Sequence, residues 1–334
     1  MRKPVILFFL ITCLLGTTTL FAAQGRISGE RAYTIPDWFK LSLMELQDDV
    51  EEARESNKHL MLFMHIDRCP YCTRMLEENF RQGKTKTFIQ SNFDVIALNI
   101  RGDREVFWDN ETSYTEKTLS RALGVHATPT IVFLNQQGQK VFQMNGYRKP
   151  SAFKHVLNYV NDQQYTKITF LDYVRLQAKT SYTLKSHPLF SSTTDLSNVK
   201  GPLAVIFEDQ TCTGCNEFHQ EVLHHKDVLQ ELKPFTLIRL DAFSNMPITD
   251  INGKQTTPKA WAKSLELDYR PGTILFDQGK EIARADGRLY HFHFKELLRY
   301  VSMKHYQQYP TYIEYLGPRQ IELLNSGVDI DFGR

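Results

Sequence analysis

The sequence predicts an α/β protein built from two consecutive copies of one domain, and three observations support this fold class. A short apolar run leads into a Cys-x-x-Cys motif that is followed by an amphipathic stretch, and this pattern occurs twice, at residues 60–72 and 203–215. An X-Pro pair and a β-rich run come about 60 residues after the first cysteine of each copy, at Pro129 and Pro271. Finally, 334 residues leave room for two domains of about 150 residues after a short leader.

The first 23 residues have the composition of a cleaved export signal. They begin with Met1-Arg2-Lys3, continue with an apolar run from Val5 to Leu15 and end with Ala22-Ala23. The run is shorter than the roughly 20 residues that a membrane-spanning helix needs, and a retained membrane anchor is the alternative. We therefore expect a soluble mature chain that begins near residue 24 and is located in the periplasm.

The first copy is expected to span residues 24–165. Phe39, Leu43, Leu46 and Val50 recur at spacings of four and three, which predicts an amphipathic helix ahead of the sheet. The other elements follow in the order strand, Cys-x-x-Cys, helix, strand, polar insertion, X-Pro with a strand, turn and closing helix. The segments that predict them are 60–65, 69–72, 75–80, 93–100, 101–117, 128–133, 135–138 and 153–160.

The second copy is expected to span residues 201–305 in the same order. Its corresponding segments are 203–208, 212–215, 218–222, 235–240, 244–259, 270–276 and 277–279. Residues 179–200 are rich in Ser and Thr, so we assign 166–200 to a connecting segment between the domains. Residues 306–334 form a C-terminal tail, for which we expect only a packing role.

The chain has five cysteines, of which Cys13 lies in the predicted signal. The other four form Cys69-Pro70-Tyr71-Cys72 and Cys212-Thr213-Gly214-Cys215, so none remains for a separate structural disulfide. Two such pairs can also make a tetrahedral zinc site, but zinc knuckles usually bring their pairs within tens of residues, and 143 residues separate Cys69 from Cys212. The pattern favours two redox-active dithiols and no metal.

Two thiols at the start of a helix have different chemical environments. The first sulfur faces the unpaired N–H groups of the helix N-terminus, which stabilise its thiolate and lower its pKa below the free value of about 8.5. The second sulfur lies one turn deeper, where it can attack a mixed disulfide formed by the first. We therefore predict that Cys69 and Cys212 are nucleophiles and that Cys72 and Cys215 resolve the mixed disulfides.

The two X-Pro pairs, Thr128-Pro129 and Arg270-Pro271, supply the other half of each predicted site. A cis-proline beside the thiols exposes backbone groups that can pair with an extended substrate strand. Arg270 is a candidate cation near Cys212 that would favour its thiolate and make the second site the more oxidising one. The alternative is that Arg270 points to solvent.

The order of strand, Cys-x-x-Cys, helix, long connection, X-Pro, β-hairpin and closing helix resembles the thioredoxin fold in both halves of the chain. The first half is similar to periplasmic thioredoxins of the sulfur-oxidation pathway, the SoxW type. The matching segments are 36–40, 69–72, 99–106, 128–130 and 146–150. This resemblance implies thiol–disulfide oxidoreductase activity on exported protein disulfides, with electrons drawn from a membrane thiol carrier and no cofactor beyond the cysteine pairs.

The sequence departs from the thioredoxin pattern at the position six residues before each first cysteine. The buried acid found there in thioredoxin is replaced by Phe63 and Ile206. His65 and Glu208 lie four residues before the two nucleophiles, which makes them candidates for proton transfer. The alternative is that both are solvent-facing side chains at strand ends.

The sequence favours a reductase among the functions that this fold supports. Pro70-Tyr71 between the first cysteines resembles glutaredoxins and SoxW-type reductases, while oxidase and isomerase activities remain alternatives because they differ only in reduction potential. A peptide-binding or chaperone module without turnover is an alternative of another class. The chain has 40 basic and 38 acidic residues, a net charge of +2, so no surplus of positive charge indicates a nucleic-acid partner. We expect the protein to be a monomer.

Overall fold

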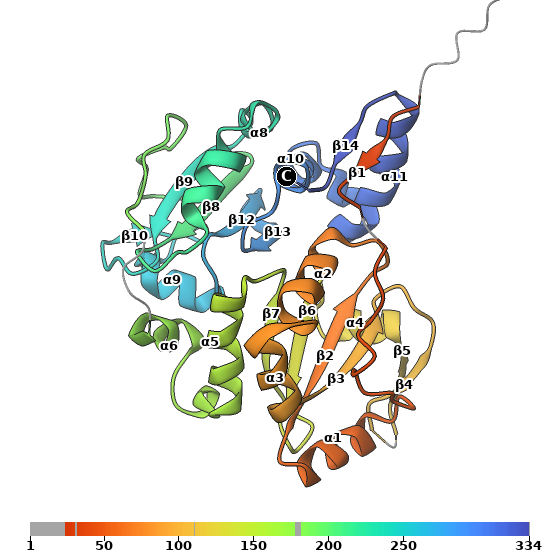
Figure 1. Cartoon of the computed structure of the whole chain (residues 1–334). Helices are drawn as coiled ribbons and strands as arrows, with labels where there is room; N and C mark the ends of the chain where they lie inside the picture. The colour runs from red at the N-terminus through yellow and green to blue at the C-terminus, as the bar shows by residue number, and fades with distance from the viewer. Residues whose placement is uncertain (1–23, 31, 110, 178–181, 334) are drawn as a thin grey trace, which may run out of the picture.

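The computed structural model describes residues 24–30, 32–109, 111–177 and 182–333 (Figure 1). The predicted signal peptide therefore lies outside the described residues. Each copy of the repeat forms a four-stranded mixed sheet with helices on both faces, and the two sheets have the same strand order. The predicted α/β class with two tandem domains is confirmed.

The first sheet has the order β3-β2-β6-β7. The central strand β2 (His59–His65) runs parallel to β3 (Phe93–Asn99) and antiparallel to β6 (Thr130–Leu134), which pairs in turn with β7 (Lys140–Asn145). Every residue of β2 is buried, which explains why its sequence is a continuous apolar run with no alternation.

Helices of the first domain cover both faces of this sheet. The core on one face is formed by α2 (Pro70–Met75), the π-helical turn η1 (Leu76–Phe80), α3 (Gly83–Asn92) and α5 (Pro150–Asn161). The other face is covered by α1 (Leu46–Glu55) and α4 (Glu116–Ala122). The Cys-x-x-Cys motif thus lies at the end of a central strand, where the chain enters a helix.

The predicted helix over 39–50 begins later than the periodicity suggests. Leu46 and Val50 are buried on α1, but Leu43 is 93% exposed and lies before the helix. Met44 has a positive φ of 68°, which is incompatible with helix and turns the chain just ahead of Leu46. Phe39 is buried in the core on the opposite face of the sheet, so the four residues do not form one stripe.

The second domain repeats the first sheet with the order β13-β12-β8-β9. Strand β8 (Leu203–Glu208) runs parallel to β9 (Thr236–Asp241) and antiparallel to β12 (Gly272–Asp277), and β13 (Lys280–Asp286) pairs with β12. The polar insertions also correspond, since each contains a short hairpin. These hairpins are β4 (Glu105–Phe107) with β5 (Ser113–Thr115), and β10 (Ile248–Thr249) with β11 (Gln255–Thr256).

Helices also cover both faces of the second sheet. The core on one face includes residues of the π-helical turn η3 (Phe218–Leu223), α8 (Lys226–Leu232) and α10 (His291–Ser302), and α9 (Pro258–Ser264) packs on the other face. Helix α7 (Cys215–Glu217) is a single short turn that passes directly into η3.

The connecting segment belongs mostly to the two domains that it joins. Helix α6 (Phe170–Gln177) places Phe170 and Tyr173 in the core of the first domain, which therefore extends beyond the expected boundary at 165. Phe190 forms a parallel bridge with Leu237 at the edge of the second sheet, so that part of the predicted linker adds to the second domain.

The two ends of the described chain meet beside the second domain. After η4 (His305–Gln307) and α11 (Tyr312–Asn325), strand β14 (Ile330–Asp331) pairs in parallel with β1 (Ile27–Ser28), which lies beside α11 in Figure 1. The tail thus has the expected packing role, and it also holds the N-terminal strand. No helix among the described residues is long and apolar enough to cross a membrane.

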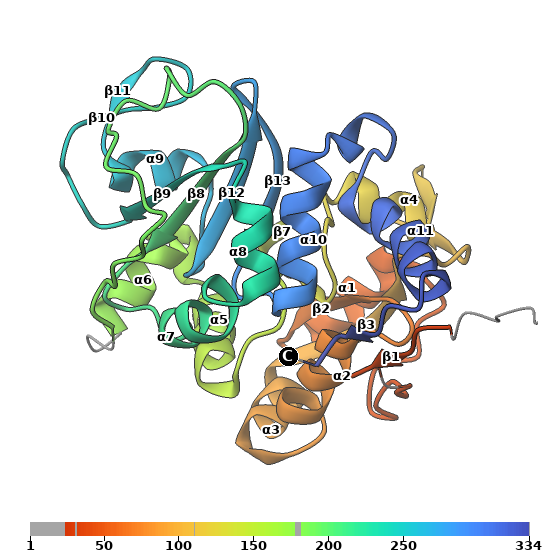
Figure 2. The ribbon, with the colours of Figure 1, turned by 90° about the horizontal axis from the view of Figure 1, so that it is seen from above.

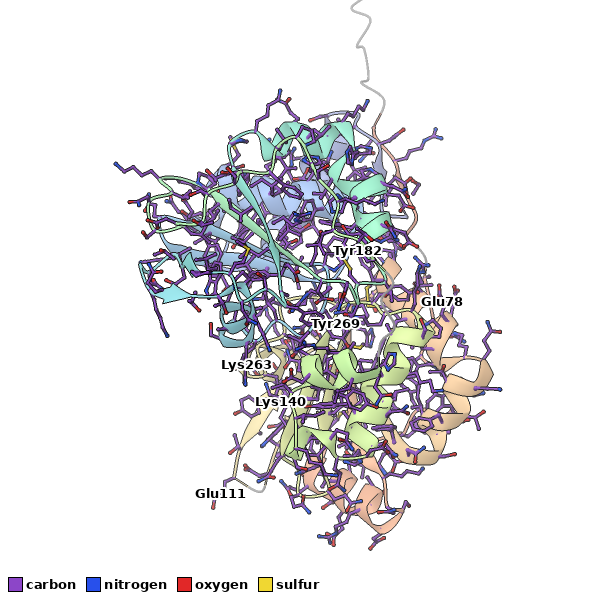
Figure 3. All side chains as sticks on the ribbon, turned by 90° about the vertical axis from the view of Figure 1, so that its left-hand side faces the viewer. Glu78, Glu111, Lys140, Tyr182, Lys263 and Tyr269 are labelled. Atoms are coloured by element: carbon purple, nitrogen blue, oxygen red, sulfur yellow. A yellow bond between two sulfur atoms is a disulfide. The ribbon has the colours of Figure 1, made fainter. Side chains whose placement is uncertain are left out.

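The loops that follow β7 and β13 bring the two domains into contact. Arg148 donates a hydrogen bond from Nη2 to the carbonyl oxygen of Asp286 (2.5 Å), and its guanidinium lies 3.4 Å from the centroid of the Tyr269 ring. Gly287 is required at this contact, since a Cβ there would lie 2.7 Å from Arg148 Nη1. Figures 2 and 3 show the two halves in contact, and Figure 3 places Tyr269 at the boundary between them.

Candidate functional site

The first Cys-x-x-Cys motif begins helix α2, and its two sulfurs form a disulfide. Cys69 caps the helix, and the backbone N–H of Cys72 is directed to Cys69 Sγ over 3.0 Å. Pro70 occupies the first helical position, where its fixed φ suits the helix and no backbone N–H is needed. A helical N–H beside the sulfur favours the thiolate after reduction, which supports the predicted role of Cys69 as nucleophile.

The second motif also forms a disulfide, but its helix begins only at Cys215. Thr213 between the two cysteines is exposed. Cys212 and Cys69 keep 3% and 4% of their surface exposed, whereas Cys215 and Cys72 have none. In both motifs the first cysteine is the less deeply buried of the two, which agrees with its predicted role as nucleophile.

Both X-Pro peptide bonds are cis, as the sequence predicts. The Thr128 hydroxyl lies 3.5 Å from Cys69 Sγ, and the Thr128 carbonyl oxygen lies 3.7 Å from the same sulfur. Pro271 lies beside the second motif, because a Cβ added to Gly214 would be 3.7 Å from Pro271 Cδ. Each cis-proline loop is therefore next to its thiols, where its backbone can pair with an extended substrate.

Arg270 does not point to solvent, because its side chain turns inward to an acidic partner. Its side chain is only 4% exposed and forms an ion pair with Asp209, with Nε and Oδ2 2.9 Å apart. Its Nη1 donates to the carbonyl oxygens of Leu267 and Tyr269. Burial lowers the pKa of Arg270, and the Asp209 carboxylate opposes that shift. The solvent-facing alternative for Arg270 is therefore wrong, while its effect on the Cys212 thiolate stays a prediction, with Asp209 as a neighbouring charge that opposes that effect.

His65 is buried at the end of β2, so it is not a solvent-facing strand-end residue. Its Nδ1 lies 2.8 Å from the hydroxyl of Tyr33, and that hydroxyl donates to the carbonyl oxygen of Ile66 (2.6 Å). Burial lowers the pKa of His65, and the nearby Asp67 raises it by a smaller amount. His65 is thus a neutral imidazole near neutral pH.

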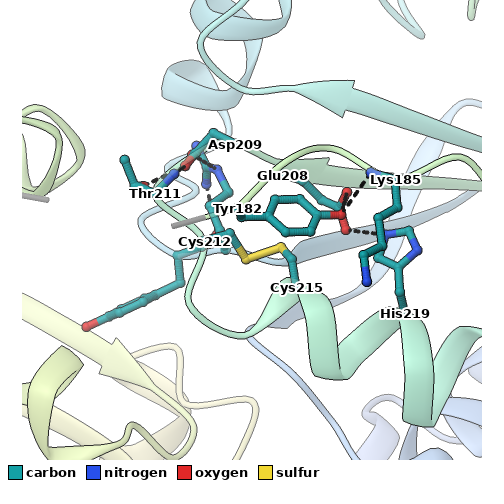
Figure 4. The surroundings of a disulfide bond; sticks show 10 residues. Tyr182, Lys185, Glu208, Asp209, Thr211, Cys212, Cys215 and His219 are labelled. Carbon is teal, nitrogen blue, oxygen red and sulfur yellow. Dashed lines mark hydrogen bonds and ion pairs between the residues drawn. A yellow bond between two sulfur atoms is a disulfide. The ribbon is translucent and has the colours of Figure 1, made fainter. Parts of the chain in front are cut away.

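Glu208 has the corresponding place in the second domain and is fully buried. One carboxylate oxygen accepts a hydrogen bond from the hydroxyl of Tyr182 (3.0 Å), and the other lies 2.8 Å from Nε2 of His219. Figure 4 shows the Tyr182 ring beside the Cys212–Cys215 disulfide with its hydroxyl directed to Glu208. Glu208 is therefore not a solvent-facing side chain either.

The sequence analysis did not identify Tyr33, Tyr182 or His219. The two tyrosines come from the segments ahead of the two sheets, and each bonds to the side chain four residues before the nucleophile. Tyr33 precedes Cys69 by 36 residues and Tyr182 precedes Cys212 by 30, so the offset of 143 residues between the two copies does not align the two tyrosines.

A small pocket between the domains is lined by residues from both motifs. It includes Tyr71 from the first motif, and Thr213 and Gly214 from the second. Tyr147 and Pro271 are also among its lining residues. The two redox motifs thus border a common space, although each pair of sulfurs forms its own disulfide.

The fold and the two sites define a class of protein. Two Cys-x-x-Cys disulfides where a helix begins, each beside a cis-proline, are the apparatus of a thiol–disulfide oxidoreductase. The family model of the thioredoxin-like domain matches residues 46–161 and 192–302. The chain therefore belongs to the thioredoxin-like family, and it contains the domain twice.

Several solved structures are similar to this chain. A thioredoxin-fold protein from Helicobacter pylori is 23% identical, with 34% of this chain and 74% of that chain covered and a TM-score of 0.31. A thioredoxin from Thermus thermophilus is 19% identical, with 41% and 87% covered and a TM-score of 0.28. The DsbD C-terminal domain of Neisseria meningitidis in the oxidised form is 15% identical, with 35% and 91% covered and a TM-score of 0.26. No curated protein matches the chain.

Proposed function

We propose that this protein is an exported reductase of protein disulfides and that it uses both Cys-x-x-Cys pairs. The observation that carries the proposal is the arrangement of each site, in which the first cysteine is less deeply buried than the second and a cis-proline lies beside them. The Pro70-Tyr71 pair, which resembles the SoxW type, favours the reducing direction. The leader sequence favours export to the periplasm.

The reaction transfers two electrons from the dithiol to the substrate. The Cys69 thiolate attacks one sulfur of a substrate disulfide, which breaks that S–S bond and releases the other substrate sulfur as a thiolate. Cys72 then loses its proton and attacks Cys69 Sγ in the mixed disulfide. The Cys69–Cys72 disulfide forms, and the second substrate sulfur leaves as a thiolate. Cys212 and Cys215 carry out the same two steps in the second domain.

The oxidised protein must be reduced again before the next turnover. Two electrons and two protons per disulfide have to come from a dithiol donor, and for an exported protein we propose a membrane thiol–disulfide carrier. The substrates are then exported proteins with disulfides, which pair with the backbone at the Thr128-Pro129 and Arg270-Pro271 loops.

Trapping of substrates tests this function directly. Cys72→Ser and Cys215→Ser stop the reaction at the mixed disulfide, so each variant expressed in the exporting cell is expected to accumulate covalent adducts that reduction releases. The matched controls, Cys69→Ser/Cys72→Ser and Cys212→Ser/Cys215→Ser, lack the nucleophile and should trap nothing. Absence of adducts from both single variants would overturn the oxidoreductase proposal and favour a binding module without turnover.

The direction of electron flow needs a separate measurement. The reductase proposal expects reduction potentials near the value of about −270 mV typical of thioredoxin, and far from the value of about −120 mV of a strong oxidant such as DsbA. Equilibration of each pair with glutathione or dithiothreitol buffers gives these potentials, with the other pair replaced by serines. Potentials near the oxidant value at both sites would assign disulfide formation to the protein.

A further inference from the structure

The two domains share an arrangement that lies outside the Cys-x-x-Cys motif. In each, a tyrosine from the segment ahead of the sheet bonds to the titratable side chain at the end of the central strand. Tyr33 bonds to His65, and Tyr182 bonds to Glu208, at 2.8 and 3.0 Å. The pairs join residues that are 32 and 26 positions apart, so the upstream segments must be in place before either site is complete.

In the second domain the tyrosine connects this arrangement with the sulfurs. Tyr182 is 3% exposed and packs in one cluster with Cys212 and Cys215. Its hydroxyl accepts from the backbone N–H of Lys185 (3.2 Å), which leaves its own hydrogen for Glu208. The ring therefore lies against the disulfide while the hydroxyl holds the carboxylate (Figure 4).

His219 makes the second-domain group able to exchange a proton without water. Its Nε2 faces Glu208, and both side chains are at most 1% exposed. Its Nδ1 is buried with no hydrogen-bond partner among the described residues. The carboxylate and the imidazole are thus close enough for a proton to pass between them directly.

The first domain has a base in the corresponding place. Because the Tyr33 hydroxyl donates its hydrogen to the Ile66 carbonyl oxygen, it must accept from His65, which fixes the hydrogen of the neutral ring on Nδ1. Nε2 then carries a lone pair and is able to accept a proton. Tyr33 also packs against the core cluster that contains Cys69 and Cys72.

We infer that His65 in the first domain and the Glu208–His219 pair in the second accept the proton of the resolving thiol, and that Tyr33 and Tyr182 are the positioning residues that hold them. This inference rests on the proposed oxidoreductase function. In the second domain the proton of Cys215 Sγ passes to the Glu208–His219 pair, and the thiolate attacks Cys212 Sγ. The Cys212–Cys215 bond forms and the bond from Cys212 to the substrate sulfur breaks, so that this sulfur leaves with the electron pair.

Other charged and titratable groups surround the two sites and will contribute to any pH profile. Those around the first site are Asp67, Arg104 and Glu116. Those around the second are Lys185, His187, His224, Arg239 and Asp241. Because several of these are present in each domain, the inference is tested by isosteric replacement of one residue at a time and not by the wild-type pH profile alone.

The test follows the resolving step on the full chain in the Cys69→Ser/Cys72→Ser background. Reduced protein reacts with an aromatic disulfide that releases one coloured thiolate when Cys212 attacks and a second one when Cys215 resolves. We expect Glu208→Gln to slow the second release at least tenfold at neutral pH, since positioned proton transfer contributes about 10²–10⁴-fold. The first release should keep its rate, and the second should recover as pH rises and solvent base replaces the carboxylate.

Two further variants separate the proton role from a structural one. Tyr182→Phe retains the ring against the disulfide and is expected to slow the second release in the same direction. Tyr315→Phe is the matched control, because the Tyr315 hydroxyl donates to buried Glu296 (2.8 Å) in the same domain, outside the cluster that contains the cysteines. It should lower stability similarly and leave both releases unchanged.

An unchanged second release in both Glu208→Gln and Tyr182→Phe across the pH range would overturn the inference. Equal slowing by Tyr315→Phe would do the same, since it would show a general loss of order. The reagent is an artificial disulfide, so the result is independent of the direction of electron flow and of the natural substrate. Failure of substrate trapping in the cell would thus count against the proposed function alone.

Discussion

The hydroxyl of Tyr71 accepts a hydrogen bond from the backbone N–H of Tyr290 over 2.8 Å. The two rings stack with their centroids 5.0 Å apart, and Nδ1 of His293 lies 3.3 Å from the same hydroxyl. Burial lowers the pKa of His293 to about 3, so its ring is neutral and accepts the tyrosine hydrogen. The residue before Cys72 is therefore held by the start of α10, which belongs to the other domain.

This contact predicts that the second domain limits access to the first site. Tyr71→Phe leaves the buried N–H of Tyr290 without its acceptor, which we expect to cost about 1–3 kcal/mol of stability in urea unfolding. In the reduced protein, Cys69 should also react faster with a bulky maleimide while its rate with iodoacetamide stays nearly constant. A matched control is Tyr147→Phe, whose hydroxyl donates to Glu78 within the first domain. A similar gain of bulky-reagent reactivity in this control would contradict the prediction.

The ion pair between Arg270 and Asp209 leads to a prediction on stability and one on thiol pKa. Arg270→Met leaves a buried carboxylate unpaired and is expected to cost about 3–5 kcal/mol in chemical denaturation. The double variant Arg270→Met/Asp209→Asn should recover much of this loss, because it removes both charges.

The same double variant tests the effect of Arg270 on the thiol. The pKa of the Cys212 thiol in the double variant should stay within about half a unit of the wild-type value, since two uncharged side chains replace two charges that cancel each other. An increase of the Cys212 pKa by a full unit or more in the double variant would show that the positive charge of Arg270 stabilises the Cys212 thiolate.

The parts of the site that were predictable depend on contacts close in sequence. The strand, the two cysteines and the helix start lie within a dozen residues, and their hydrophobic periodicity is visible directly. The cis-proline loops were predictable because both copies place them at nearly the same distance from the motif. The repeat thus supplied the long-range information that a single domain would lack.

The parts that were not predictable depend on side chains from distant segments. Burial of Glu208 requires Tyr182 and His219, and the neutralisation of Arg270 requires Asp209, whose ion pair spans 61 positions along the chain. The hydrogen bond between Tyr71 and Tyr290 spans 219 positions and depends on how two domains dock. No local period or spacing encodes such pairings.

The carboxyl of Asp268 predicts a pH dependence of stability at the domain boundary. Burial raises its pKa to about 7 from 3.8, and the Asp286 carboxylate adds to the shift, while Arg270 opposes it. Between about pH 4 and 7 the folded protein retains a proton that the unfolded chain has lost, so the free energy of unfolding falls as pH rises through this window. The shift corresponds to a loss of at most about 4 kcal/mol.

Asp268→Asn tests this dependence. The variant should be more stable than the wild type at pH 8 and nearly equal to it at pH 4, as measured by urea unfolding at both pH values. Glu55→Gln is a suitable control because this side chain is exposed and is not among the charges that shift the pKa of Asp268. A wild-type stability that rises between pH 4 and 7, or an Asn variant with the same slope as the wild type, would show that Asp268 is ionised in the folded protein.

The packing of the C-terminal tail predicts that the tail affects access to the first redox site. Phe332 is 4% exposed, and its ring centroid lies 5.2 Å from that of Phe292 and 4.9 Å from that of His293. Phe332→Ala removes this packing next to the residues that hold Tyr71, and we expect a loss of about 3 kcal/mol in urea unfolding. Exposure of Cys69 to bulky maleimide should increase as in Tyr71→Phe. Val328→Ala serves as the control, since a side chain that is 42% exposed should change stability by no more than about 0.5 kcal/mol. Loss of stability in Phe332→Ala without increased Cys69 reactivity would show that the tail stabilises the second domain alone.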